Sequence, residues 1–364
     1  MNVGDFDFEL PPELIAQEAP GRGTARLLHV DRDSGRLTHT RVTALPDLVR
    51  AGDLIVVNNS RVFPARLLGR RVPSGGAVEC LLIARMGAGG ATTPDANESD
   101  PDSAGAEFWE ALVHPGQKLK PGARMVFDGG HIVHGEVLER RSFGRRLVRL
   151  WTEDGSTLGE AVDAIGHVPL PPYIKRDDRP DDRERYQTVF ARTRGSVAAP
   201  TAGLHFTPAL ADGLKARGVQ FAEITLHVGY GTFQPVRVDR VEDHRLDAEE
   251  YDISAGAAAA IAAALRDGRR VIAVGTTTTR TLEAVARSHD GAIVAGRGAT
   301  DLFIYPGFEF RVVRGLLTNF HLPRSSLLML VSAFAGAEHA RAAYQAAIAG
   351  RYAFYSYGDA MLVL

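Results

Sequence analysis

Two short segments of the chain each place a histidine among glycines and other turn-forming residues. The histidines are His205, within 200–206, and His227, within 225–233. An imidazole has an ordinary pKa of about 6.5, so it can accept or donate a proton near neutral pH. Glycine lets the backbone adopt conformations closed to other residues and approach a ligand closely. We therefore take both histidines as candidate catalytic residues. The alternative is two buried histidines whose rings are satisfied by backbone carbonyl groups.

A third segment, 275–281, leaves an apolar strand and enters a helix. Backbone N–H groups at a helix start can hold a carboxylate, a phosphate or a ribose. The glycine spacing of a dinucleotide-binding loop and the lysine of a P-loop are missing, so a well-capped structural turn is the alternative. The candidate binding residues of the three segments are Gly203, Gly229, Gly231, Thr232, Gly275, Thr276, Thr277 and Arg280.

Basic residues could contact the phosphates of a nucleic acid in two places. Lys175 and Arg176 end a proline-stiffened strip, 166–176, and Arg61 ends a polar turn. The alternatives are an ordered linker and solvated surface charge. The aromatic residues of 352–359 could stack on a purine, although a packed chain end explains them as well. No pair of histidines four residues apart shares a helix face with an acidic partner, so we expect no metal site.

Composition limits the kinds of protein that this chain can be. Its 364 residues predict about two domains, and 45% hydrophobic with 24% charged residues is typical of a globular protein. The single cysteine excludes an internal disulfide and suits a reducing cytoplasm. The acidic start lacks the order of a secretion signal, and no apolar run approaches the roughly 20 residues that span a bilayer. The net charge of −2 means that any nucleic acid must be held by a local basic patch. We expect a cytoplasmic monomer.

The pattern of strands and helices changes along the chain. Residues 65–150 contain short strands separated by turns and lack helical periodicity, which predicts a small inserted β-barrel. Strands alternate with capped helices in 151–364, which together with 1–64 predicts a discontinuous α/β domain with a largely parallel or mixed sheet. Within the barrel, 86–107 is almost free of apolar residues and is predicted to be a disordered loop. Ligands of such α/β sheets bind at the carboxyl ends of the strands, where His227 and Gly275 fall.

A series of ordered segments along the chain carries a family resemblance. They are 6–11, 14–17, 58–67, 169–175, 184–189, 198–206, 226–236, 275–283, 300–307, 318–323 and 356–361. Through them the chain resembles, nearly from end to end, the S-adenosylmethionine:tRNA ribosyltransferase-isomerase family of queuosine biosynthesis. Two departures are Asp247, where the family often has a second histidine, and a longer, more polar 86–107 loop.

The resemblance implies a specific reaction and specific partners. The family moves the ribosyl part of S-adenosylmethionine onto the aminomethyl group of a 7-deazaguanine at the wobble position of tRNA with a GUN anticodon. Adenine and methionine leave, and the sugar becomes an epoxycyclopentanediol in the product, epoxyqueuosine-tRNA. S-adenosylmethionine is then a co-substrate, and no permanently bound cofactor is expected. The implied fold is an α/β domain with a small inserted β-barrel.

Within that reaction the sulfonium acidifies the adjacent methylene, so the first step needs a base. His205 or His227 takes this role in our interpretation, and the other protonates the departing adenine. Glu249 or Asp301 could steady the sulfonium or bind ribose hydroxyls, and Arg280 could pair with the methionine carboxylate. Two alternatives stay open. One is an S-adenosylmethionine-dependent RNA methyltransferase, although its glycine-rich first loop is absent. The other is a non-catalytic RNA-binding protein that uses its barrel as a platform.

Overall fold

The computed structural model describes residues 1–87, 105–233 and 236–364, which divide into two compact units. The larger unit comprises Met1–Arg61, Pro171–Asp177 and Glu184–Leu364, and the barrel unit comprises Val62–Leu170 and Asp178–Arg183. Most of the loop predicted over 86–107 lies outside the described residues. Within the described ranges no helix has the length and apolar character needed to cross a bilayer.

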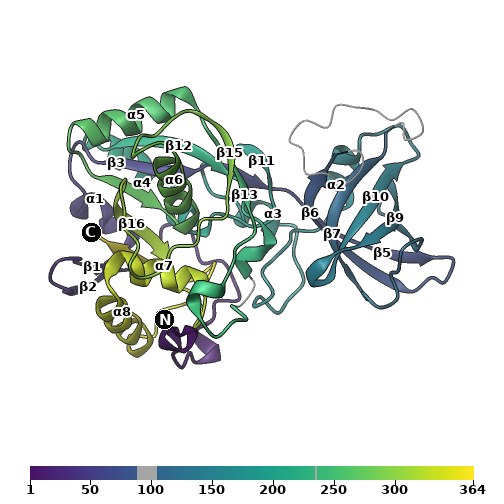
Figure 1. The fold of residues 1–364 in the computed structure, drawn as a ribbon, viewed down its shortest axis with the longest axis horizontal. Coiled ribbons are helices and arrows are strands. Elements are labelled where there is room, and N and C mark those ends of the chain that lie inside the picture. The colour runs from purple at the N-terminus through teal and green to yellow at the C-terminus, as the bar shows by residue number, and fades with distance from the viewer. Residues whose placement is uncertain (88–104, 234–235) are drawn as a thin grey trace. The chain divides into compact units, whose positions relative to one another are not determined.

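A nine-stranded sheet forms the centre of the larger unit, in the order β15-β13-β12-β3-β14-β16-β17-β1-β2 (Figure 1). The neighbouring strands β12, β3, β14 and β16 are parallel, whereas β13, β15, β17 and β2 each form an antiparallel pair. The sheet is therefore mixed, with a parallel centre. Its strands are β1 (Arg26–Val30), β2 (Leu37–Arg41), β3 (Leu54–Asn58), β12 (Gln220–Leu226), β13 (Glu249–Ile253), β14 (Val271–Val274), β15 (Gly296–Thr300), β16 (Val313–Asn319) and β17 (Ala360–Val363).

Helices cover both faces of this sheet, because its central strands are apolar on both sides. All five residues of β3 are buried: Leu54 and Val56 pack into one core cluster, and Ile55 and Val57 pack into another. The first cluster includes residues of α5, α6, α7 and α8, and the second includes residues of α1 and α4. The helices are α1 (Leu45–Leu48), α3 (Asp182–Arg185), α4 (Pro208–Ala216), α5 (Ala255–Arg266), α6 (Thr276–Ser288), α7 (Ser326–Ala335) and α8 (Ala337–Ala349).

The barrel unit is a closed antiparallel barrel in the order β10-β7-β6-β5-β8-β9 (Figure 1). Its free cysteine, Cys80, is fully buried in β6. One helix, α2 (Leu158–Ile165), begins at the N-cap Thr157, whose side chain accepts a hydrogen bond from the Glu160 N–H. The strands are β5 (Arg66–Val72), β6 (Ala77–Met86), β7 (Glu107–His114), β8 (Arg124–Asp128), β9 (Ile132–Arg140) and β10 (Arg145–Thr152), and a separate two-stranded sheet joins β4 (Ser60–Val62) to β11 (Thr193–Ser196).

These observations confirm the predicted fold class, an α/β domain with a mixed sheet and a small inserted β-barrel. They also place α2 in the barrel unit, beyond residue 150.

Candidate active site

A cleft opens in the larger unit where parallel strands end. It encloses about 70 Å³ of water-accessible space. Val228 follows β12, Gly275 follows β14, and Thr318 and Asn319 end β16, and all four residues line the cleft. This is the edge at which α/β sheets bind ligands. Apart from His321, the lining side chains are apolar, hydroxyl or amide groups, and no Asp, Glu, Lys or Arg of the described chain lines the cleft.

The N-terminus of α6 forms one wall of the cleft. Gly275 precedes the helix with a φ of 92°, a left-handed conformation that favours glycine, and its N–H donates to the Leu317 carbonyl. No side chain caps the helix. The hydroxyl groups of Thr278 and Thr279 donate to main-chain carbonyls four residues back, but the buried Oγ1 of Thr277 has no hydrogen-bond partner among the described residues. A buried polar atom without a partner is costly, so a ligand atom is expected there.

Tyr355 and Ser356, near the chain end, form another part of the cleft wall. Tyr355 adopts a φ of 73°, which is strained for an aromatic residue, and its buried hydroxyl also lacks a partner within the described chain. Its ring stacks on Tyr173 with centroids 4.3 Å apart, and the Tyr173 hydroxyl lies 2.5 Å from Ser356 Oγ. Burial raises the pKa of both tyrosines, so their hydroxyls stay protonated at neutral pH. The two flat rings and the hydroxyl groups can contact a nucleoside.

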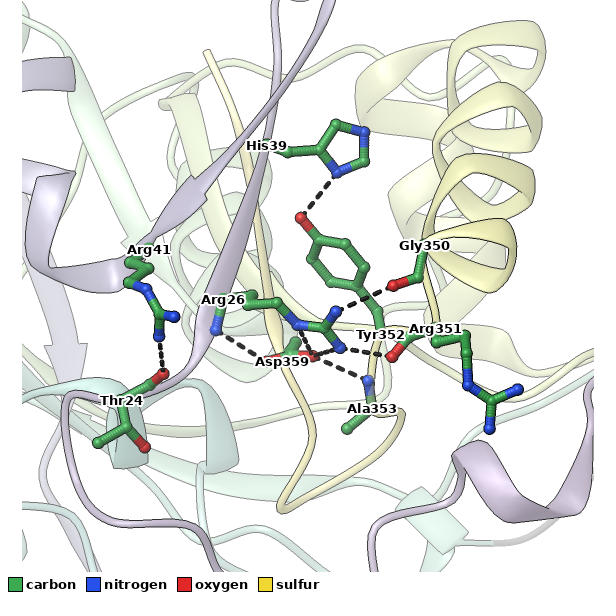
Figure 2. A network of polar contacts seen from close by, with 9 residues as sticks. All are labelled: Thr24, Arg26, His39, Arg41, Gly350, Arg351, Tyr352, Ala353 and Asp359. Atoms are coloured by element: carbon green, nitrogen blue, oxygen red, sulfur yellow. Dashed lines mark hydrogen bonds and ion pairs between the residues drawn. The ribbon is translucent and has the colours of Figure 1, made fainter.

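A buried carboxylate fixes the loop that carries Tyr355 (Figure 2). Asp359 accepts hydrogen bonds from the Arg26 backbone N–H at 2.7 Å, from the Arg26 guanidinium at 2.7 and 3.0 Å, and from the Ala353 N–H at 2.8 Å. Arg26 also donates to the carbonyls of Gly350 and Arg351 and lies 4.2 Å from the centroid of the Tyr352 ring. The network ties β1 to the chain end and so positions the cleft wall.

His205 lies at the end of the 3₁₀ helix η6 (Thr201–His205), in a smaller cavity beside the cleft. Ser356 lines both spaces. The imidazole is 5% exposed, and its Nε2 has no hydrogen-bond partner among the described residues. Burial lowers the pKa of His205 to about 4, although Asp359 and Asn319 partly oppose this. His205 is therefore neutral at pH 7 and can act as a proton acceptor.

His227 follows β12 directly and is half-buried. Its ring packs against Gly195, where a Cβ atom would lie 2.6 Å from the imidazole. The buried Nδ1 has no partner in the described part of the chain. Burial lowers the pKa of His227, while Glu250 and Asp252 act in the opposite direction. His227 does not line the cleft itself, but Val228 next to it does.

Glu249 and Arg280 form a buried ion pair. The Arg280 guanidinium donates to Glu249 Oε2, and the Gly229 N–H donates to Glu249 Oε1 at 2.9 Å. The side chain of Arg280 is 6% exposed and that of Glu249 is 7% exposed, and neither lines the cleft. The pair thus binds the segment that leads to Thr232, which does line the cleft.

The other predicted residues occupy different environments. Gly203 packs so closely that a Cβ would lie 2.8 Å from Thr188, and a Cβ at Gly231 would lie 3.0 Å from Asp247. Asp301 is exposed and lies outside the cleft lining.

The predicted nucleic-acid residues also differ from one another. Arg61 and Lys175 are exposed, whereas the Arg176 guanidinium is 3.2 Å from Glu18. The cleft thus brings together Thr232, Gly275, Thr276 and Thr277 of the predicted set.

His321 also lines the cleft, although it was not among the predicted site residues. Its Nε2 lies 2.9 Å from Thr318 Oγ1, while its N–H donates to the Tyr344 hydroxyl. Burial lowers the pKa of His321 to about 3. Its signals in the sequence were the tight turn after β16 and its place in 318–323, one of the segments that carry the family resemblance. No group of three His, Cys, Asp or Glu side chains that could hold a metal ion occurs within residues 1–87, 105–233 and 236–364.

Comparisons with known proteins agree along the whole chain. The profile of a family described as queuosine biosynthesis protein matches residues 3–363. A protein of Geobacter metallireducens is 50% identical and one of Heliobacterium modesticaldum is 47% identical, each with both chains fully covered. Both are named S-adenosylmethionine:tRNA ribosyltransferase-isomerase. A crystal structure of an S-adenosylmethionine tRNA ribosyltransferase from Thermotoga maritima matches with a TM-score of 0.53 and 36% identity, covering 99% of this chain and 100% of that one.

Proposed function

Because the chain belongs to the S-adenosylmethionine:tRNA ribosyltransferase-isomerase family of queuosine biosynthesis, we propose that it transfers and isomerises the ribosyl group of S-adenosylmethionine onto tRNA. The acceptor is the aminomethyl group of a 7-deazaguanine at the wobble position of a tRNA with a GUN anticodon. A bond forms between that amine and the sugar, adenine and methionine leave, and the product is epoxyqueuosine-tRNA. S-adenosylmethionine is a co-substrate, and the enzyme works in the cytoplasm as a monomer.

The observation that carries the proposal is that the buried hydroxyl groups of Thr277 and Tyr355 have no hydrogen-bond partner among the described residues, in a cleft that no described Asp, Glu, Lys or Arg lines. Both atoms need a polar ligand, and the N-terminus of the 13-residue helix α6 favours an anion. S-adenosylmethionine offers a carboxylate, ribose hydroxyls and a flat adenine. In our proposal the carboxylate or the ribose binds at Gly275 to Thr277, and adenine lies near Tyr355.

In this proposal, the neutral histidines around the cleft transfer the protons. Burial lowers the pKa of His205, His227 and His321, so each ring is unprotonated at neutral pH and has a free nitrogen lone pair. We keep His205 and His227 as base and acid, because each has a buried ring nitrogen without a partner in the described chain. Asp301 stays a candidate for binding ribose hydroxyls. Glu249 and Arg280 act through the position of the Gly229 backbone in this proposal.

The reaction is tested by chromatography after incubation with S-adenosylmethionine and tRNA that carries the 7-aminomethyl-7-deazaguanine base. Release of free adenine and methionine is expected. Formation of S-adenosylhomocysteine would identify a methyltransferase instead, and no consumption of S-adenosylmethionine would leave a non-catalytic RNA-binding protein.

Two variants test the role of His227. His227→Ala should abolish adenine release while tRNA affinity stays near that of the parent. Gly195→Ala should slow it too, because the new methyl group displaces the His227 ring. The control is His289→Ala, since His289 is the C-cap of α6, its ring Nδ1 lies 2.9 Å from the Val285 carbonyl oxygen, and it lines neither the cleft nor the smaller cavity. Near-normal turnover by His227→Ala would eliminate His227 as base or acid and shift the role to His205 or His321.

A further inference from the structure

The turn between β9 and β10 of the barrel presents an aromatic ring to solvent. Phe143 is 80% exposed, whereas the other exposed large apolar residues of the described chain are at most 47% exposed. Its backbone has φ 54° and ψ 30°, a left-handed conformation that bulky residues rarely adopt. Strain of this kind is retained where the residue has a use outside the fold. Because most of its surface is exposed, the ring buries little apolar area in the turn.

A buried arginine holds this turn and a second loop in place. Arg146 is 7% exposed and donates to the carbonyls of Gly144, Gly116 and Leu119 at 3.0, 3.0 and 3.3 Å. The loop around Gly116 is thereby fixed next to the turn that carries Phe143. A ring held in this way loses little conformational entropy when it binds a ligand.

Three exposed cations lie on the two segments that Arg146 links to this turn. Lys118, Lys120 and Arg140 are exposed, and their side chains have no hydrogen bond or ion pair within residues 1–87, 105–233 and 236–364. Arg140 is close enough to Arg146 to lower the pKa of its guanidinium, together with burial. The same end of the barrel also carries Glu110, which pairs with Arg145 at 2.8 Å, and Glu139, which lies 3.7 Å from Arg141. The carboxylates are therefore matched by arginines, and the three unpaired cations remain.

We propose that this surface, formed by Phe143, Lys118, Lys120 and Arg140, binds the tRNA substrate. Phe143 stacks on an unpaired base, and the three cations contact phosphates beside it. An exposed aromatic ring among basic residues is the combination that binds unpaired nucleotides, because every base has a flat face and every phosphate a negative charge. The choice of tRNA as ligand rests on the proposed function.

The test measures the affinity of the full-length protein for a fluorescently labelled tRNA transcript, by anisotropy and without S-adenosylmethionine. Phe143→Asn removes the ring and places a residue that accepts the left-handed conformation. Phe143→Asn should weaken tRNA binding about tenfold, whereas Phe143→Trp, which keeps an aromatic ring, should bind tRNA as tightly as the parent. The melting temperature of Phe143→Asn should be equal to or above that of the parent, whereas a purely structural ring would lower it. Ile132→Thr is the control, because Ile132 is 46% exposed at the opposite end of β9.

The charges are tested through salt. The triple variant Lys118→Gln, Lys120→Gln, Arg140→Gln should lower the slope of log affinity against log salt by about three. The proposal is overturned if Phe143→Asn and the triple variant both bind tRNA as tightly as the parent. It is also overturned if this surface binds a protein partner in place of tRNA. Adenine release by the parent tests the proposed function separately, so either idea can fail without the other.

Discussion

The buried ion pair between Arg280 and Glu249 leads to a prediction that separates two roles for Arg280. From the sequence, Arg280 should bind the methionine carboxylate, so its loss should weaken S-adenosylmethionine binding. In the structure the guanidinium is bound to Glu249, and the two side chains are 6% and 7% exposed. Replacing Arg280 by methionine should therefore act first on stability, because it leaves the Glu249 carboxylate buried without a counter-charge.

The size of the effect follows from the burial. Removal of one partner from a buried ion pair costs about 3–5 kcal/mol, because the remaining charge is neither hydrated nor neutralised. Glu249 keeps one hydrogen bond, from the Gly229 N–H at 2.9 Å, which places Arg280→Met near the lower end of that range. The double variant Glu249→Gln, Arg280→Met removes both charges, so it should recover part of the loss. The coupling energy of the double-mutant cycle should be about 1–3 kcal/mol.

Urea unfolding of the four proteins measures these free energies, and titration calorimetry measures S-adenosylmethionine binding by those that remain folded. Arg297→Met is the matched control, because Arg297 pairs with Asp252 at 3.1 Å on the same sheet edge but is 73% exposed. Its loss should cost less than about 1 kcal/mol. A stability loss by Arg280→Met no greater than that of the control, together with a clear loss of S-adenosylmethionine affinity, would refute the reasoning and support a direct contact with the ligand.

Three further outcomes are expected. First, the free energy of unfolding should fall as the pH drops below about 6.5, because the unfolded chain then binds protons that the folded chain does not. This difference persists until the pH reaches the folded-state pKa values, about 4 for His205 and about 3 for His321. Each histidine contributes a slope of about 1.4 kcal/mol per pH unit, so urea unfolding of the double variant His205→Asn, His321→Asn should show a flatter pH profile. Second, burial raises the pKa of Cys80 to about 12, so a disulfide reagent at pH 8 should modify the thiol only after unfolding, and rapid modification of the folded protein would contradict the closed barrel. Third, Asp359→Asn should lower the free energy of unfolding in urea by about 2 kcal/mol and raise the half-saturating concentration of S-adenosylmethionine, because the loop carrying Tyr355 loses its ionic contact with Arg26. Unchanged turnover parameters would show that this contact does not affect the cleft.

Local signals in the sequence located most of the fold. Thr207 and Ser254 are N-caps, and the helices α4 and α5 begin directly after them, as their side chains predict. The sequence did not indicate every strand, and the edge strand β15 is one that it did not indicate. β15, for example, is Gly296–Thr300, and most of its residues are not buried, so no apolar alternation marks it. Such strands depend on the neighbour with which they pair, which a single sequence does not reveal.

The site was harder to predict from the sequence, because its residues lie far apart in the chain and come together only through the order of the strands in the sheet. Gly275 and Val228 both lie at the carboxyl ends of parallel strands, and the general rule for such sheets predicts that ligands bind there. In contrast, Glu249 and Arg280 carry opposite charges and lie 31 positions apart, and nothing local indicates that each neutralises the other. Tyr355 was one of several aromatic residues singled out near the chain end, and only the structure shows that this ring, unlike those of Tyr352 and Tyr357, lines the cleft.

The neutrality of the cleft bears on the proposed first step. Loss of a proton from the methylene beside the sulfonium turns a cation into a neutral ylide, so a carboxylate next to the sulfur would stabilise the cation more than the ylide. Such a carboxylate would raise the pKa of the methylene and slow the step. Glu249 is already paired with Arg280, and no Asp or Glu of the described residues lines the cleft. A neutral imidazole is then the appropriate base, because it imposes no negative charge on the sulfonium before the proton moves. An aspartate introduced at Asn319 should therefore tighten S-adenosylmethionine binding and reduce turnover.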